Sequence, residues 1–272
     1  MTRATALITV FNEETWIAQA VQSLLDQTLA DIDILVIDDG STDATPDILA
    51  RIDDPRLRVL RRERMGRAAA LAMGVVEARG DYVAILDADD EAYPERLTRQ
   101  VAFLDAHPEV AWLGCGEERR DTQRGETAER FYPTTDKAIR RMAARCIPYS
   151  HSGVTFRRSL RDEGLNYDPS VPYLIDFEFF LRVAEHHEVA NLGDVLVMRR
   201  LRDESFFQSR FKRRAQNRAL ARLSAGAVRR FGLPVWHLGY PLARLGYDLV
   251  PNRLKQRLRR AAGLTERFGA QG

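Results

Sequence analysis

The chain has 272 residues, of which 45% are hydrophobic and 29% are charged, and its formal net charge is +2. This length and composition favour one sizeable soluble domain with an appended segment. The two cysteines, Cys115 and Cys146, exclude a disulfide framework and a paired-cysteine metal site, and no signal-peptide pattern follows Met1, so we expect a cytoplasmic protein.

Short apolar runs alternate with amphipathic helical patterns along the first hundred residues. This alternation predicts a mostly parallel sheet covered by helices, so the expected fold class is α/β. The expected strands cover 5–10, 33–37, 57–60 and 81–86, and the expected helices lie near 17–25, from about 44, over 66–78 and over 94–105.

Polar side chains follow each expected strand. Because open α/β sheets bind ligands at the carboxyl ends of their strands, we expect these groups to converge on one edge. A turn with a helix N-cap would account for Ser41 to Asp43, and the same role stays open for Asp38 and Asp39. The four groups are Phe11 to Glu14, Asp38 to Asp43, Arg64 to Arg67, and Asp87 to Asp90.

The stretch AILDADDEAYPERL, residues 84–97, carries three aspartates directly after an apolar run. Asp90 or Glu91 could be first-turn charges of a helix that has Pro94 at its first position. That role does not explain Asp87 and Asp89, whose carboxylates would repel each other unless a cation lay between them. Mg²⁺ commonly binds one or two carboxylates together with substrate phosphates, so we expect a metal ion that carries a diphosphate.

Two long stretches resemble the donor-binding half of family 2 glycosyltransferases with the GT-A fold. They are TVFNEETWIAQAVQSLLDQTLADIDILVIDDGSTDATPDIL and GRAAALAMGVVEARGDYVAILDADDEAYPERLTRQVAFLDAHPEV. The resemblance implies a nucleotide-sugar donor, Mg²⁺ or Mn²⁺ as cofactor, and inversion at the anomeric carbon. It also implies one GT-A domain over 1–205, with a donor half to about 115 and an acceptor half over 116–205, before a basic helical segment over 206–272.

The resemblance also assigns roles to residues of the donor side. Asp39 would accept a hydrogen bond from the base, and uracil offers one N–H there, so a UDP-sugar is favoured. Asp87 would lie nearer the ribose, and Asp89 would bind the metal. Arg202 stands where a histidine is common, which replaces a metal ligand with a cation. The remaining implied contacts are Thr9, Phe11 and Glu13 in the nucleotide pocket, Ala88 within the acidic motif, Arg67 near the diphosphate, and Arg200, Arg202 and Ser205 in a late motif near the same group.

Asp176, in VPYLIDFEFFLRVA, aligns with the expected general base of the resembling family. An inverting displacement needs a carboxylate opposite the leaving group to accept the proton of the acceptor hydroxyl. Ile175 stands where a glutamate is usual, and Asp176 could instead be the N-cap of the following helix. His151, in a nearby loop, could face the donor or the acceptor, or be incidental.

Three functions compete on the sequence. The first is a glycosyltransferase that acts on a glycan or lipid-linked acceptor of bacterial cell-surface polysaccharide synthesis, or on a small molecule. The second is a phosphatase with Asp87 as nucleophile, although its motif would normally follow the first strand. The third is a non-catalytic sugar-nucleotide-binding protein, which the isoleucine at position 175 makes conceivable.

The last part of the chain is basic. Residues 199–272 contain 18 Lys and Arg against four Asp and Glu, whereas residues 1–198 contain 23 against 35. An Arg-rich helix is expected over 206–230, then an aromatic segment with Trp236, Tyr240 and Tyr247 that is too short and too polar to span a bilayer. Its aromatic and basic residues suit an interfacial helix on anionic lipid, and so peripheral attachment to the cytoplasmic face of the inner membrane.

Other partners for these C-terminal helices are the catalytic body or a second subunit in a homo-oligomer. Nucleic acid is not expected, because nothing else in the chain resembles a recognition module.

Overall fold

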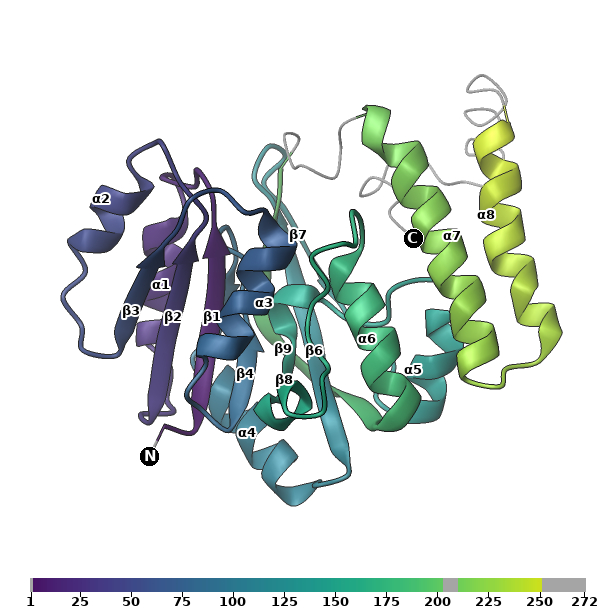
Figure 1. The fold of residues 1–272 in the computed structure, drawn as a ribbon, viewed down its shortest axis with the longest axis horizontal. Coiled ribbons are helices and arrows are strands. Elements are labelled where there is room, and N and C mark those ends of the chain that lie inside the picture. The colour runs from purple at the N-terminus through teal and green to yellow at the C-terminus, as the bar shows by residue number, and fades with distance from the viewer. Residues whose placement is uncertain (1, 203–209, 251–272) are drawn as a thin grey trace.

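The computed structural model describes residues 2–202 and 210–250. One nine-stranded sheet forms the centre, in the order β3-β2-β1-β4-β8-β6-β9-β5, with β7 paired to β6 (Figure 1). Its strands are β1 (Ala4–Val10), β2 (Ile32–Asp38), β3 (Leu57–Arg61), β4 (Tyr82–Ile85), β5 (Glu91–Ala92), β6 (Val110–Asp121), β7 (Glu126–Arg130), β8 (Thr155–Arg157) and β9 (Glu188–Leu201).

The helices connect these strands and continue after the last of them. The α-helices are α1 (Ile17–Leu25), α2 (Thr45–Ala50), α3 (Arg67–Glu77), α4 (Arg96–Ala106), α5 (Asp136–Ala143), α6 (Ile175–His186), α7 (Arg210–Arg230) and α8 (Gly239–Leu249). The 3₁₀ helices are η1 (His151–Gly153), η2 (Arg158–Arg161) and η3 (Val235–Leu238).

The first four strands form the parallel part of the sheet. β1 pairs in parallel with β2 and with β4, and β2 pairs in parallel with β3. Their carboxyl ends therefore meet at one edge, as the sequence predicts. The α/β class and the four expected strand and helix pairs are confirmed.

Alternating side chains of these strands supply two separate core layers. Leu7 and Leu35 point to the face where α3 packs, and Ile8 and Val36 point to the face covered by α1. Period-two alternation puts neighbouring strand residues on opposite faces, so a strand that is apolar at every position must be covered on both sides.

The start of α4 differs from the prediction. The helix begins at Arg96 and not at Pro94, so Asp90 and Glu91 are not first-turn charges. Glu91 instead belongs to β5, which pairs in antiparallel fashion with β9. The predicted role of Asp90 in the first helical turn is wrong. Pairing of this short segment with β9 takes precedence over the local sequence pattern that is typical of a helix start.

The second half of the sheet is mixed. β8 lies antiparallel between β4 and β6, and β6 then pairs in parallel with β9. An aromatic cluster covers this half, in which the Trp112 ring lies 5.6 Å from Phe156 and 5.5 Å from Phe179 between ring centroids. The proposed boundary between donor and acceptor halves near residue 115 falls inside β6.

The C-terminal helices pack at the end of the molecule farthest from α2 (Figure 1). α7 contacts α5 and α6 and buries Ala221, Ala227 and Val228, and α8 runs beside α7. The expected helix over 206–230 is thus confirmed for Arg210–Arg230, and Ser205 and the basic run after residue 250 lie outside the described residues. In the two described ranges, no helix is long and apolar enough to cross a membrane.

Candidate active site

The loops after β1 and β2 are held together by short polar side chains. Asn12, which has a positive φ of 54°, accepts a hydrogen bond from Thr42 N at 2.8 Å and donates its own backbone N–H to Ser41 Oγ at 3.0 Å. Ser41 N in turn donates to Asp38 Oδ1 at 2.9 Å. The turn role expected for this segment is confirmed, although the N-cap of α2 is Ala44 and makes no side-chain bond.

Asp39 and Phe11 lie at the predicted nucleotide end of this edge. The Asp39 carboxylate is buried and accepts backbone N–H groups from Met65 at 2.6 Å and from Gly66 at 3.0 Å. Phe11 is partly exposed, and the Arg64 guanidinium carbon lies 3.1 Å from the centroid of its ring. Asp39 thus orders the loop between β3 and α3, and that loop covers Phe11.

Arg67 begins α3 and faces the first aspartate of the acidic motif. Its guanidinium donates to Asp87 Oδ1 at 2.5 Å and to His151 Nδ1 at 3.1 Å. The same Nδ1 lies 3.5 Å from Asp87 Oδ1, and the other ring nitrogen, Nε2, lies 3.0 Å from the Tyr167 hydroxyl. His151 is therefore part of the site and contacts both Asp87 and Arg67.

The charges around Arg67 place the acids of both halves in one site. Burial would lower the pKa of Arg67, but the Asp87, Asp176 and Asp89 carboxylates together raise it. Burial would likewise raise the pKa of Asp87, yet the Arg67 guanidinium and then His151 hold it well below its usual range. Attraction to opposite charges thus outweighs desolvation at both residues, and both stay ionised at neutral pH.

Asp89 is held from the end of β9. Arg202 donates to Asp89 Oδ2 at 2.5 Å and to both oxygens of Glu13, at 2.8 and 3.0 Å. Arg200 is buried and donates to the Asp89 carbonyl at 2.6 Å and to Gln19 Oε1 at 2.8 Å. It also pairs with Glu91 and lies over the ring of Trp16.

Asp90 has a structural role that the sequence did not predict. It is buried, accepts the backbone N–H of Arg200 at 2.9 Å, and accepts the hydroxyl of Ser152. Burial, followed by the Asp89 and Asp87 carboxylates, raises its pKa well above the usual range. The three acids of this motif therefore differ in role. Asp87 and Asp89 each have an arginine partner, whereas Asp90 connects its own loop to the segments that contain Arg200 and Ser152.

Asp176 lies in the first turn of α6, at the second helical residue. The N-cap is Leu174, which adopts a left-handed conformation with φ of 55° and makes no side-chain bond, so the N-cap role considered for Asp176 is wrong. Burial first, and then the Asp176 carboxylate, raise the pKa of both Tyr149 and Tyr167. The carboxylate therefore lies close to both tyrosines and to Arg67.

Arg199 is a second residue that the sequence did not single out. Burial would lower its pKa, but Glu117, Asp90 and Asp87 raise it, so the guanidinium lies among these acids. Regular alternation puts it on the opposite side of β9 from Arg200. The signal in the sequence was only the Arg199-Arg200 pair at the end of a strand.

Two further predicted residues lie at the same edge. Thr9 is partly exposed near the end of β1. The Ala88 side chain packs into the core with Leu86, Ala92 and Leu97, so only its backbone could contact a ligand. The roles in donor binding proposed for both residues remain predictions.

The acidic motif fits a divalent cation that substrate phosphates help to hold. Asp87 Oδ1 and Asp89 Oδ2 are engaged by arginines, whereas the second oxygen of each carboxylate makes no hydrogen bond to any described residue. Within 2–202 and 210–250, no cluster of three or more His, Cys, Asp or Glu could enclose a metal unaided. Two free carboxylate oxygens completed by phosphate oxygens are a typical Mg²⁺ arrangement.

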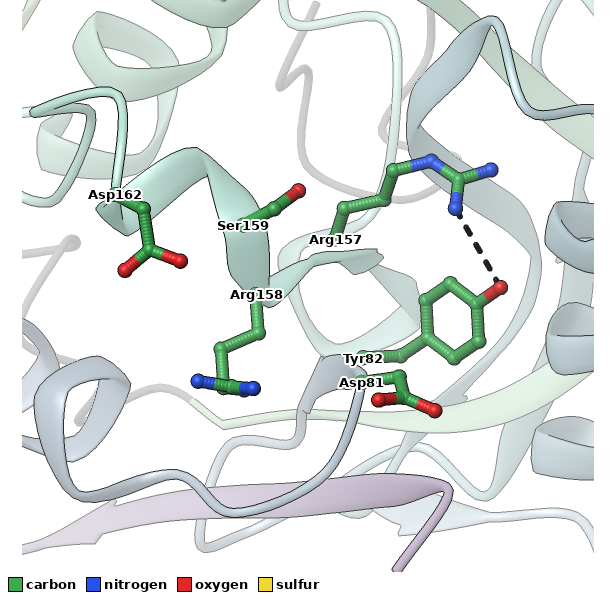
Figure 2. A pocket seen from close by; sticks show the side chains of 6 residues that line it. All are labelled: Asp81, Tyr82, Arg157, Arg158, Ser159 and Asp162. Atoms are coloured by element: carbon green, nitrogen blue, oxygen red, sulfur yellow. Dashed lines mark hydrogen bonds between the residues drawn. The ribbon is translucent and has the colours of Figure 1, made fainter.

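A pocket of about 300 Å³ opens elsewhere, at the amino end of β4 (Figure 2). Tyr82 in its wall begins β4, whereas Asp87 follows the other end of that strand, so this pocket is separate from the acidic motif. Its lining residues are Asp81, Tyr82, Arg157, Arg158, Ser159 and Asp162.

Comparison with known proteins identifies the family. The family model described as glycosyl transferase family 2 matches residues 5–165, which include both Asp87 and Asp89. The chain belongs to this family. It is therefore a glycosyltransferase, and the family assignment supports neither the phosphatase nor the sensor alternative.

Named relatives of this glycosyltransferase include two proteins of polysaccharide biosynthesis. It is 30% identical over 197 residues to the amylovoran biosynthesis glycosyltransferase AmsE of Erwinia amylovora, and the match covers 70% of this chain and 73% of AmsE. It is 38% identical over 103 residues to the succinoglycan biosynthesis protein ExoO of Rhizobium meliloti, covering 38% of this chain and 30% of ExoO. The second match is therefore confined to a part of ExoO.

Solved structures share the fold of this glycosyltransferase. Residues 1–349 of TarS from S. aureus, in complex with UDP-GlcNAc, align with a TM-score of 0.68 and 18% identity over 89% of this chain and 72% of that one. The mannosyltransferase PcManGT of Pyrobaculum calidifontis, in complex with GDP-Man and Mn²⁺, aligns with a TM-score of 0.67 and 20% identity. The alignment covers 97% of this chain and 81% of PcManGT. These likenesses confirm the expected GT-A fold.

Proposed function

We propose that the protein transfers a sugar, with inversion and with a divalent cation, from a nucleotide diphosphate sugar to a glycan hydroxyl. The observation that carries the proposal is the grouping of Asp87, Asp89 and Asp176 around the Arg67 guanidinium. Two of these acids follow β4 and the third begins α6, so donor and acceptor halves contribute to one site. This grouping supports a diphosphate and a reacting hydroxyl at adjacent positions.

Asp176 is the proposed general base. An inverting transfer needs one carboxylate that accepts the proton of the attacking hydroxyl while the leaving group departs on the opposite side. The start of α6 fixes the position of Asp176, and the Tyr149 and Tyr167 side chains lie beside it. Their raised pKa values keep both phenols protonated, so neither tyrosine is a candidate for the general base.

The other proposed roles concern the diphosphate. Asp87 and Asp89 would hold Mg²⁺ or Mn²⁺ through their free oxygens, and the bound cation would neutralise charge on the leaving diphosphate. Arg67 would approach the same phosphates, because its guanidinium lies against the acidic motif and a planar guanidinium suits phosphate oxygens. Arg202 would lie beside the second aspartate, whereas Arg200 would hold the loop in place.

A UDP-sugar is the favoured donor. Thr9, Phe11, Glu13 and Asp39 would form the nucleotide pocket, with the base near the Phe11 ring and the Asp39 carboxylate. A TarS structure is described as a complex with UDP-GlcNAc and the PcManGT structure as a complex with GDP-Man. Both nucleotides are thus compatible with the fold, and the test must include both.

The acceptor is proposed to be a glycan of bacterial cell-surface polysaccharide synthesis. The support is the naming of AmsE for amylovoran biosynthesis and of ExoO for succinoglycan biosynthesis. A lipid-linked form of such a glycan would be presented at the cytoplasmic face of the inner membrane.

The test of this function is a donor screen. Purified protein is incubated with UDP- and GDP-sugars and Mn²⁺ or Mg²⁺, with and without glycan acceptors, and release of nucleoside diphosphate is measured. We expect release with one sugar class, faster with a suitable acceptor and lost in chelator. Binding of every donor without any turnover would overturn the proposal in favour of a non-catalytic sugar-nucleotide-binding protein.

The outer surface of η3 and α8 supports peripheral attachment to an anionic membrane. Val235, Trp236 and Leu242 are 75%, 74% and 65% exposed, and Tyr240 and Leu245 extend this apolar surface. The surrounding segment carries the excess of basic residues found in 199–272. Exposed aromatic and aliphatic side chains with nearby arginines suit the headgroup region of anionic lipids.

Vesicle sedimentation tests this attachment with point variants of the full chain. We expect wild type to sediment with vesicles that contain phosphatidylglycerol at low salt, and to be released as salt rises. Trp236→Asp combined with Leu242→Asp should stay in the supernatant, whereas Val76→Asp, which alters an exposed valine on α3, should behave like wild type. If wild type forms dimers that the double variant loses and neither binds vesicles, the surface is a subunit interface.

A further inference from the structure

Arg202 connects two carboxylates that lie 76 positions apart in the chain. It donates two hydrogen bonds to the Glu13 carboxylate, at 2.8 and 3.0 Å, and one to Asp89 Oδ2 at 2.5 Å. About a quarter of each side chain in this triad is exposed, so solvent reaches the group. One guanidinium therefore neutralises the aspartate that the acidic motif would offer to a cation.

The neighbouring Arg200 provides a contrast on the same strand. Its guanidinium is buried and is held by the Asp89 carbonyl, Gln19 and Glu91, with the Trp16 ring 4.2 Å from its guanidinium carbon. Leaving these partners would leave the buried Arg200 guanidinium without hydrogen-bond acceptors, which is costly. Arg200 is therefore a fixed part of the loop, whereas Arg202 has a contact that can be released.

The two contacts of Arg202 are not equivalent. The paired bonds to Glu13 would keep the guanidinium in the site even when Asp89 no longer accepts from it. The N–H group freed in that way remains beside the acidic motif, where it can donate to a phosphate oxygen. Charge-assisted bonds of this kind are among the stronger hydrogen bonds in proteins.

We propose that Arg202 is an exchangeable counter-ion of Asp89. Without donor it occupies this carboxylate and competes with divalent cations; when the donor binds, Arg202 stays on Glu13, releases Asp89 and binds the diphosphate. The proposal rests on the proposed function for the identity of the diphosphate. It gives Arg202 two effects of opposite sign, because the residue opposes binding of the cation alone and favours binding of the nucleotide.

Two binding measurements test the exchange without any turnover. Mn²⁺ binding to the donor-free protein is followed by electron paramagnetic resonance, and binding of UDP and of GDP in chelator is followed by calorimetry. For Arg202→Gln we expect Mn²⁺ to bind about tenfold tighter and the better nucleotide about tenfold more weakly than in wild type, since each change removes one charge-assisted contact. Arg99→Gln, which alters an exposed ion pair with Glu95 and Asp194, should leave both affinities unchanged.

Arg202→Lys is the second variant, and it preserves the charge. A lysine cannot offer the planar fork that reaches two carboxylates, so both affinities should fall between those of wild type and Arg202→Gln. If the glutamine variant is unstable, tighter Mn²⁺ binding together with weaker nucleotide binding in Arg202→Lys than in wild type still supports the exchange.

The outcomes of these binding measurements distinguish failure of the exchange from failure of the proposed function. Equal Mn²⁺ affinity in wild type and Arg202→Gln overturns the exchange alone, and so does a loss of both affinities, which would mark a structural role. If none of the variants binds Mn²⁺, the exchange and the metal-dependent part of the proposed function both fail. If wild type binds neither nucleotide in the presence of Mn²⁺ and turns over no donor, the proposed function itself is wrong.

Discussion

The Asp90 carboxylate accepts a hydrogen bond from the backbone N–H of Arg200 at 2.9 Å. This bond ties the acidic loop after β4 to the end of β9, and Ser152 ties the same carboxylate to η1. Three segments far apart in the sequence are thus held at one buried side chain. The positions of Asp89 and Arg202 depend on this junction, because each lies within two residues of one of its members.

Asp176→Asn should separate binding from chemistry. The amide keeps the shape of the side chain but cannot accept the hydroxyl proton, so turnover should fall on the order of a hundredfold or more. Donor affinity should stay near that of wild type. Nucleoside diphosphate release and calorimetric titration with donor measure the two effects.

Glu178→Gln is the matched control for Asp176. Glu178 is also in the first turn of α6, but its carboxylate pairs with Arg182 at 2.8 Å on the same helix. This change should leave turnover within about twofold, because the Glu178 carboxylate is held by Arg182 and makes no hydrogen bond to the proposed catalytic residues. A collapse of donor affinity in Asp176→Asn would instead assign Asp176 to donor binding.

Asp89→Ala should abolish turnover. The substitution removes a proposed metal ligand and leaves the charge of the departing diphosphate uncompensated. The rate of nucleoside diphosphate release in saturating Mn²⁺ is the measurement, and Asp47→Ala in the first turn of α2 is the control. Near wild-type rates for Asp89→Ala in chelator would show that the reaction needs no metal at this residue.

Glu117→Gln should destabilise the fold in a pH-dependent way. Glu117 is fully buried and accepts hydrogen bonds from Arg119 Nε at 2.7 Å and the Tyr132 hydroxyl at 2.9 Å. Burial would raise its pKa, but Arg199 and Arg119 hold the pKa below the usual range. The ionised carboxylate therefore stabilises the folded state above its unfolded pKa, and the stabilisation is lost as the pH falls through the folded pKa.

Urea unfolding at several pH values measures this effect. At pH 7 we expect the variant to be less stable by about 1–3 kcal/mol, the range for a lost buried hydrogen bond to charge. The difference should stay constant down to about pH 5 and shrink below about pH 4, where the unfolded glutamate becomes protonated. A difference that grows on acidification would contradict the lowered pKa.

Arg96→Met should destabilise the protein through the loss of buried hydrogen bonds. Arg96 is completely buried and donates to the carbonyls of Ile85, at 2.8 Å, and of Val154, at 3.1 Å, and burial lowers its pKa to about 10. Loss of both bonds should cost roughly 2 kcal/mol or more. Arg99→Met, at a surface ion pair, should leave the free energy of unfolding nearly unchanged in the same assay.

Local patterns in the sequence were enough to predict the parallel half of the fold. Apolar runs and helical periodicity depend on neighbours along the chain, so the strands and helices of the first hundred residues could be located. Parallel pairing then predicts that Phe11, Asp39, Arg67 and Asp87 share one edge. The order of strands in the second half could not be predicted in this way, because β8 lies between β4 and β6 by contacts of long sequence separation.

The same limit explains the site residues that the sequence did not reveal. Asp90 looks like a helix-start residue until its partners, Ser152 and Arg200, are placed beside it. Arg199 gains its surroundings only from the pairing of β9 with β6. The left-handed backbone at Leu174 has no sequence signal either, since such conformations usually select glycine or asparagine.

The pairing of β6 with β9 has a consequence for protein engineering. β6 spans residue 115, where donor and acceptor halves would be divided. β9 contacts the acceptor half through Val189, near its start, and the donor loop through Arg200, near its end. A chimera that joined the first 115 residues to the remainder of a relative would change parent in the middle of β6, a strand at the centre of the sheet. Recombination of specificities in this protein should therefore exchange surface loops and keep both long strands from a single parent.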